Sequence, residues 1–488
     1  MQENNLKRKV ISGLFWRYME RTLAQGIQLL VTIVLARILM PEEYGTVALV
    51  SVLINIALVF VQNGFGNALI QKEDADSTDF STAFYFSLGL SLIIYLILYV
   101  TAPYVGAFYR NDALTPLVRG LSVSIIIASV GTVQHAYVSR TMQFRKFFFS
   151  TLTGTIVSAF TGIGAALMGL GAWALIIQQL TNQCIDTLIL WHTSGWRPTR
   201  EFSLKSLKHI YGYGWKLLLS GLIDTVYSNL YTLIIGKKFS AGDVGYYEKG
   251  RQFPALIIMN VNATIQSVLF PALSSQQSDR AKTKAMTRRA IKTSTFIIFP
   301  CMAGLSVIAK PLIVLVLTEK WLPAVTYLRF FCLIYAVWPV HTANLQAINA
   351  LGRSDIFLKL EIIKKALGIT VLLITIPMGL KAMMIGSCIV SYIGMILNAS
   401  PNIRLLNYSL VELARDLMPS VLLSAFMSAI ILCAGSFIAN DLLKILVQMV
   451  LGICVYAGTA ALVKAESFVY IMDTIRDIGK EGMNFGEK

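Results

Sequence analysis

Apolar runs of about twenty residues recur along almost the whole chain, and they constrain its fold more than any other feature. Wound as a helix, a run of this length spans the ~30 Å hydrocarbon core of a bilayer. Only 14% of the residues are charged, whereas a soluble domain carries about 25%. The ~10-residue alternating segments of a membrane β-barrel do not occur in the sequence. The pattern predicts an all-α, polytopic membrane protein.

We predict fourteen membrane spans, with an uncertainty of about two in that count because neighbouring runs can be joined wrongly. The fifth and sixth runs, for example, meet at the sequence GLGAW, residues 169–173. Little chain remains outside the runs, so we expect no soluble domain. The predicted spans are 12–39, 43–70, 82–108, 114–138, 148–169, 172–192, 215–236, 252–273, 293–313, 323–350, 358–377, 379–401, 417–437 and 440–463.

The distribution of Lys and Arg predicts the orientation, because these residues accumulate in cytoplasmic loops. If the N-terminus is cytoplasmic, the cytoplasmic segments hold 28 of the 42 Lys and Arg residues, and the opposite loops, with the ends of the adjoining spans, hold about 10. Both termini are then cytoplasmic. Anionic lipid at that surface explains the net charge of +16 without a nucleic-acid partner. The basic segment DRAKTKAMTRRAIKT, residues 279–293, is accordingly expected to be a loop facing membrane lipid.

Cysteine and histidine give no sign of a disulfide or a metal site. The six cysteines all fall inside predicted spans without a C-x-x-C pair, and the four histidines do not cluster with them. A G-x-x-x-x-G-K-[ST] motif for ATP is also absent from the sequence. We therefore expect no metal and no cofactor, and a proton or Na⁺ is the ion that could couple transport. The cysteines are Cys184, Cys301, Cys332, Cys388, Cys433 and Cys454.

The first span carries five polar or charged residues in its N-terminal half: Arg17, Glu20, Arg21, Gln25 and Gln28. A charge at the centre of a spanning helix costs about 2.5–3.5 kcal/mol, whereas a leucine returns only about 0.3–0.6 kcal/mol. Such residues persist when they pair or face a wet cavity. Arg17 and Arg21 share one face, and Glu20 can pair with Arg17. Alternatively, both arginines snorkel to lipid headgroups.

Weaker polar stripes mark other spans. Amides on bundle helices often join helices, but an ionisable residue inside a membrane is a functional candidate by default. We predict that cargo is bound by Arg17, Arg21, Gln25, Gln28, Asn63, Asn67, Arg251, Asn262, Gln266, Asn344 and Gln346. The candidates for ion coupling are Glu20, Asp224 and Asp186. No catalytic residues are predicted, because the longest outward loop, 237–251, has no acid/base pair.

The sequence contains an internal repeat. Residues 11–45 resemble 210–245, so that Gly13 matches Gly212 and Gly45 matches Gly245, and two further matches follow in the same order. Both copies begin with a helix that leaves the same side, which predicts two parallel six-helix bundles. The lobes are 1–200 and 201–402, followed by two more spans and a cytoplasmic tail, 403–488.

The repeated turns MPEEYG, residues 40–45, and SAGDVG, residues 240–245, should lie on the same membrane side. The first is acidic through Glu42 and Glu43, and the second is flanked by lysines such as Lys249. We predict that these opposite charges form a closable gate.

Several segments carry a family resemblance: LARILMPEEYGTVALV (35–50), GFGNALIQKEDADSTDFSTAFYF (64–86), APYVGAFY (102–109), VGYYEKGRQFPAL (244–256), QSVLFPALSSQQSD (266–279) and INALGRSDIFLKLEIIKK (348–365). In order and spacing the chain resembles Wzx-type flippases, in the polysaccharide-transporter branch of the multidrug/oligosaccharidyl-lipid/polysaccharide exporter superfamily. The resemblance implies two lobes around a central cavity and alternating access. It also implies an undecaprenyl-diphosphate-linked oligosaccharide as cargo, for O-antigen, capsule or exopolysaccharide, in the bacterial inner membrane. A polysaccharide polymerase and a chain-length regulator are the partners it suggests.

Two related transporters are the alternatives. Multidrug exporters of the superfamily take mostly cationic compounds, whereas the candidate cavity charges here lean positive. A guanidinium fork instead matches the oxygens of a diphosphate. Lipid II flippases depend on arginines in their first, second and eighth helices. Arg17, Arg21 and Arg251 match the first and eighth, but the second span has no arginine, which speaks against lipid II as the cargo.

Overall fold

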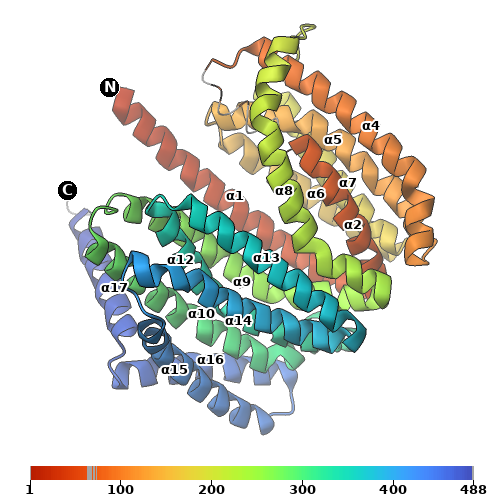
Figure 1. Ribbon diagram of the computed structural model, residues 1–488. Coiled ribbons are helices and arrows are strands. Elements are labelled where there is room, and N and C mark those ends of the chain that lie inside the picture. Colours follow the sequence, from red (N-terminus) through yellow and green to blue (C-terminus); the bar gives the residue numbers. More distant parts are fainter. Residues whose placement is uncertain (1, 63–68, 70–71, 73, 486–488) are drawn as a thin grey trace. The chain divides into compact units, whose positions relative to one another are not determined.

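The computed structural model describes residues 2–62, 69, 72 and 74–485, and within this part of the chain all regular secondary structure is helical (Figure 1). The all-α prediction is therefore confirmed. Asn63 and Asn67, two of the predicted cargo-binding residues, lie outside the described residues. The chain divides into two compact units, Met1–Glu248 and Lys249–Lys488. The functional lobes predicted from the repeat, with a boundary at residue 200, remain a prediction.

The first unit contains seven complete helices among the described residues and the start of an eighth. They are α1 (Gln2–Ile38), α2 (Pro41–Gln62), α4 (Ser77–Tyr109), α5 (Leu114–Arg140), α6 (Arg145–Leu167), α7 (Ala172–Ser194), α8 (Leu204–Lys238) and the beginning of α9 (Ala241–Ser274).

The second unit contains the rest of α9 and the helices that follow. These are α10 (Arg280–Leu317), α11 (Ala324–Ala336), α12 (Trp338–Ala350), α13 (Ser354–Thr375), α14 (Leu380–Leu405), α15 (Leu410–Ser436), α16 (Asp441–Leu462) and α17 (Glu466–Phe485). Two short 3₁₀ turns, Glu319–Trp321 and Ile376–Met378, join neighbouring helices.

Twelve helical segments of the described chain are long and apolar enough to cross a membrane. Two further helices that we predicted as spans, α7 and α13, are 23 and 22 residues long but are not among the twelve. A multi-pass membrane protein is therefore confirmed, whereas the count of fourteen spans stays a prediction. The predicted span 323–350 is two helices, α11 and α12, with Pro339 near the start of α12, where a missing N–H is tolerated.

Small residues let the helices of the first unit pack closely. On α6, Gly154, Ser158 and Gly162 are buried and recur every fourth residue, which places them on one face. A Cβ atom at Gly154 would lie 2.9 Å from the carbonyl oxygen of Asn182 on α7. Such stripes of small residues allow close approach of helices in membranes. Figure 1 shows α5, α6 and α7 side by side, and α1 packs mainly against α6.

The basic segment that we predicted as a lipid-facing loop is helical. α10 begins at Arg280, with Asp279 as its N-cap, and not at the predicted residue 293. The prediction was wrong because acidic side chains of α15 and α17 pair with Lys284, Arg288 and Lys292, and so hold these turns against the unit. The tail also forms a helix, α17, whose Phe468 packs on a core cluster of α10, α15 and α16.

Candidate functional site

The charged half of α1 contacts α6 through Arg17 and Glu20. The Arg17 Nη1 donates to Glu20 Oε2 at 3.0 Å, which confirms the pairing predicted from their spacing. The same guanidinium lies over the ring of Phe147 on α6, with its carbon 4.2 Å from the ring centroid. Phe147 is buried, while the Arg17 side chain is 44% exposed. Arg17 is thus held on its own helix and against α6, yet it remains accessible.

Glu20 continues into a chain of polar side chains that joins four helices. The Thr151 hydroxyl on α6 lies 3.1 Å from Glu20 Oε1 and 3.4 Å from Asp186 Oδ1 on α7. Asp186 Oδ2 lies 2.9 Å from His135 Nε2 on α5. A hydroxyl has a single proton to donate, so Thr151 serves one carboxylate at a time. We call Arg17, Glu20, Thr151, Asp186 and His135 the α1 network.

Two members of the α1 network were not predicted as site residues. Thr151 has no signal in the sequence, because a threonine in a membrane helix usually bonds to its own backbone. His135 had one signal, namely an ionisable group inside a predicted span. Its ring also stacks on Phe147, with centroids 5.0 Å apart and the planes inclined by 15°. Two of the three predicted ion-coupling residues, Glu20 and Asp186, are therefore brought together in space.

Arg21, one turn beyond Arg17 on α1, has a different environment. It is exposed, and within the described chain it has no hydrogen bond, ion pair or ring contact. Further along α1, Gln25 is half-buried and Gln28 is exposed. α1 and α8 are also the least buried of the twelve candidate spans, with 17% and 11% of their apolar windows buried. The first helix of each predicted repeat thus buries little of its apolar surface within the described chain.

The other predicted residues are more dispersed. Asp224 on α8 and Gln266 on α9 are exposed, Arg251 on α9 and Gln346 on α12 are half-buried, and Asn262 on α9 is buried with its Oδ1 unbonded.

Asn344 is fully buried. It donates to Val340 O at 2.8 Å and accepts from Asn402 Nδ2 on α14 at 2.8 Å. Its amide therefore joins α12 to α14.

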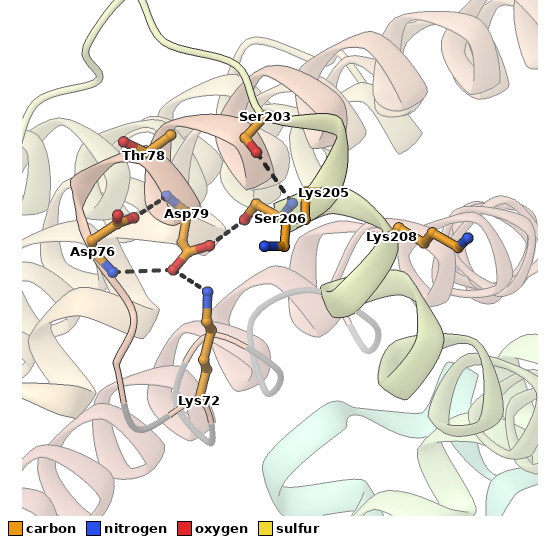
Figure 2. A pocket seen from close by; sticks show the side chains of 8 residues that line it. All are labelled: Lys72, Asp76, Thr78, Asp79, Ser203, Lys205, Ser206 and Lys208. Atoms are coloured by element: carbon orange, nitrogen blue, oxygen red, sulfur yellow. Dashed lines mark hydrogen bonds and ion pairs between the residues drawn. The ribbon is translucent and has the colours of Figure 1, made fainter.

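A pocket of about 530 Å³ lies where α4 and α8 begin (Figure 2). At its wall the buried Asp79 accepts from Lys72 Nζ at 2.5 Å and from the Ser206 hydroxyl on α8. Asp76 caps α4, and Ser203 caps α8. These bonds fasten the start of α8 to α4 within the first unit. Lys205 and Lys208 also line the pocket and are exposed.

Comparisons with known proteins point to one functional class. A family model described as polysaccharide biosynthesis protein matches residues 34–326. The chain is 26% identical over 401 residues to the lipopolysaccharide biosynthesis protein WzxC of Escherichia coli (strain K12), covering 81% of this chain and 81% of that protein. It is 23% identical over 355 residues to the teichuronic acid biosynthesis protein TuaB of Bacillus subtilis (strain 168), covering 72% and 73%.

The fold has a counterpart among solved structures. The lipid II flippase MurJ, in an inward closed conformation, superposes with a TM-score of 0.75 at 15% sequence identity. The match covers 93% of this chain and 99% of that protein. At this identity the similarity shows a shared fold of membrane helices and leaves the cargo to be argued separately.

Proposed function

The chain belongs to the family of polysaccharide biosynthesis proteins, and we propose that it is a flippase for undecaprenyl-diphosphate-linked oligosaccharides. It moves them across the bacterial inner membrane by alternating access, for the synthesis of a surface polysaccharide. Two observations support this class: relatives that act in lipopolysaccharide and teichuronic acid biosynthesis, and a fold shared with a lipid II flippase. The proposed activity is transport, without a chemical step on the cargo.

Arg21 is the residue that best supports an anionic cargo. A membrane helix tolerates an arginine when the charge finds a partner or water, and the described chain supplies no partner to Arg21. Arg17, by contrast, is already paired with Glu20. A planar guanidinium can bind two phosphate oxygens at once. We infer that Arg21 binds the diphosphate of the cargo, while Arg17 holds α1 in its position against α6.

The α1 network is the proposed coupling site. Glu20 and Asp186 share the Thr151 hydroxyl, and His135 pairs with Asp186. Two carboxylates bridged by a hydroxyl, with an imidazole on one of them, form a chain along which a proton can pass. The imidazole in the network is a group that takes up and releases protons near neutral pH, so we propose a proton rather than Na⁺ as the coupling ion.

The proposed surroundings follow from the charge distribution and the class. Both termini are cytoplasmic, in accordance with the excess of Lys and Arg in the loops on that side. Membrane lipids contact the outer faces of the helices. A polysaccharide polymerase and a chain-length regulator are the proposed protein partners, since they act on the same lipid-linked units after transport.

Deletion of the gene tests the proposed function. We expect the loss of one surface polysaccharide and the accumulation of its lipid-linked repeat unit on the cytoplasmic side, both reversed by the wild-type gene. Retention of every surface glycan together with sensitivity to cationic drugs would instead identify a multidrug exporter. Lysis with accumulated peptidoglycan precursor would identify a lipid II flippase.

A further inference from the structure

The starts of α2 and α9 touch through their backbones. A Cβ atom at Gly45 would lie 1.6 Å from the carbonyl oxygen of Ala241, and one at Gly245 would lie 2.1 Å from the carbonyl oxygen of Pro41. Real Cβ contacts are essentially never shorter than 3.0 Å, so only glycine permits this approach. All four residues belong to the first unit. We call them the glycine crossing.

The glycine crossing is symmetric with respect to the internal repeat. Gly45 corresponds to Gly245, and at the same offset Pro41 corresponds to Ala241. The contact of Gly45 with Ala241 and that of Gly245 with Pro41 are therefore the same contact made twice. When two repeats are related by a twofold axis along the membrane normal, corresponding residues of the two copies can contact each other only close to that axis. The crossing thus brings together equivalent points of the two predicted repeats within the first unit.

The neighbouring turns extend the crossing. A Cβ at Gly236, in the last turn of α8, would lie 2.4 Å from Leu49 Cδ2 on α2. A Cβ at Gly242 would lie 3.0 Å from Glu42 Oε1 and 3.6 Å from Glu42 Cγ. Figure 1 shows α8 passing beside α2, with which it makes a substantial contact. In the contact between the hairpins α1–α2 and α8–α9, α2 therefore packs against both the end of α8 and the start of α9.

Two of the charged residues beside the crossing have contacts elsewhere. Glu43 Oε2 accepts from the N–H of Met40 at 2.7 Å and so caps its own helix. The Nζ of Lys237, a lysine shortly before the SAGDVG turn, lies 3.9 Å from the ring centroid of Phe108 on α4. The two turns lie against each other, and the closest approaches between them are at the glycines. Two backbones that meet without side chains between them can separate and rejoin without rotamer changes. When they are in contact, they pack too closely to admit water.

We propose that the glycine crossing is the gate that closes one end of the transport path, and that its two hairpins separate when the protein opens there. This inference rests on the proposed function, since a gate requires a transport path. α1 and α8, the helices that lead into the crossing, bury little of their apolar surface within the described chain, so that little packing would be lost if either hairpin tilts.

A disulfide across the crossing tests the gate. In a background without the six native cysteines, E42C is combined with G242C, whose Cβ lies close to the side chain of residue 42. We expect crosslinking in membranes, loss of export and recovery on reduction. The control pair, G131C with T187C, joins α5 to α7, and the Cβ at 131 lies 3.8 Å from Thr187 Cβ. It should crosslink without stopping export. Export by the crosslinked E42C/G242C protein would overturn the proposal.

Glycine substitutions test the same contact without a crosslink. Spin labels at E42C and G242C should report a short-distance population in the wild-type background. G45A and G245A should each remove it, while G89A should retain it, because nothing lies within 4 Å of a Cβ there. If the G45A protein does not insert into the membrane, G245A tests the same contact from α9.

Persistence of the short distance in an inserted variant contradicts the gate. The distance needs no cargo, so it stays informative even if gene deletion leaves every glycan in place and refutes the proposed function.

Discussion

Each unit of the molecule holds an ionic network between its helices, and the two differ in how completely their charges are satisfied. In the second unit, Asp416 on α15 is 2% exposed and accepts two bonds from Arg288, at 2.8 and 2.7 Å. Tyr408 donates a third at 2.8 Å, and Lys292 lies 3.2 Å away. We call Asp416 and these donors the α10 network. The α1 network ends instead in two side chains, Arg17 and His135, that are 44% and 45% exposed.

The completeness of bonding distinguishes a network that holds helices together from one that can take part in transport. A buried carboxylate whose oxygens all accept bonds from the protein cannot also bind a ligand. Its removal leaves the positively charged side chains around it without a partner. Exposed ends and a hydroxyl shared between two carboxylates leave room for an exchangeable proton or an anion. The α10 network therefore fastens α15 to α10, whereas the α1 network is suited to binding and release.

The largest expected effect is the loss of stability when the α10 network loses its carboxylate. Asp416→Ala leaves Arg288 and Lys292 without their buried partner, which destabilises by about 3–5 kcal/mol. We expect little folded protein in the membrane and a lowered unfolding temperature in detergent, measured by fluorescence-detected size exclusion. Asp355→Ala is the control, because its pair with Arg353 is exposed on both sides. Equal stability of the two variants would mean that Asp416 is not a structural anchor.

Arg21→Ala should come next, with export abolished at a normal protein level. The proposed phosphate contact is lost, and no hydrogen bond, ion pair or ring contact among the described residues is broken. Arg21→Lys should restore export only in part, since an ammonium lacks the planar fork. Arg404, an exposed arginine on α14, provides the matched control as Arg404→Ala. Full export of surface glycan by Arg21→Ala would exclude the proposed diphosphate contact.

Removal of one carboxylate from the α1 network should slow export without unfolding the protein. For Glu20→Gln and Asp186→Asn we expect a loss within the about 5- to 150-fold range that a broken coupling produces. Proton release or uptake by inside-out vesicles should fall in parallel. Glu201→Gln is the control, since that carboxylate accepts from Thr78 outside the network. Unchanged proton movement in both variants would rule the network out as the coupling site.

The smallest expected effect belongs to the shared hydroxyl. Thr151→Val keeps the shape of the side chain and removes a bond worth about 0.5–1.5 kcal/mol. Export should fall less than in the carboxylate variants, with a small decrease in unfolding temperature. Thr101→Val, which loses only a bond to the backbone of its own helix, should leave export unchanged. An effect of Thr151→Val as large as that of Glu20→Gln would assign the hydroxyl a more direct role.

The sequence by itself determined the helices, the polar face of α1 and the repeat. Runs of apolar residues indicate a membrane helix wherever they occur, since the bilayer imposes the same length on each. The Arg17–Glu20 pair was predictable because a helix fixes the distance between residues three apart. The repeat likewise identified Gly45 and Gly245 as equivalent before their contact was known.

Only the tertiary structure decided which polar faces meet. Thr151 and His135 join Glu20 and Asp186 because α1, α5, α6 and α7 are rotated about their axes so that these faces converge. The sequence predicted a loop where α10 begins. In the structure Asp416 stabilises this part of α10 by bonding to Arg288, and a partner 128 positions away leaves no sign in the local sequence pattern. Local periodicity fixes a residue's position around its own helix, but the rotation of one helix against another depends on packing over the whole bundle.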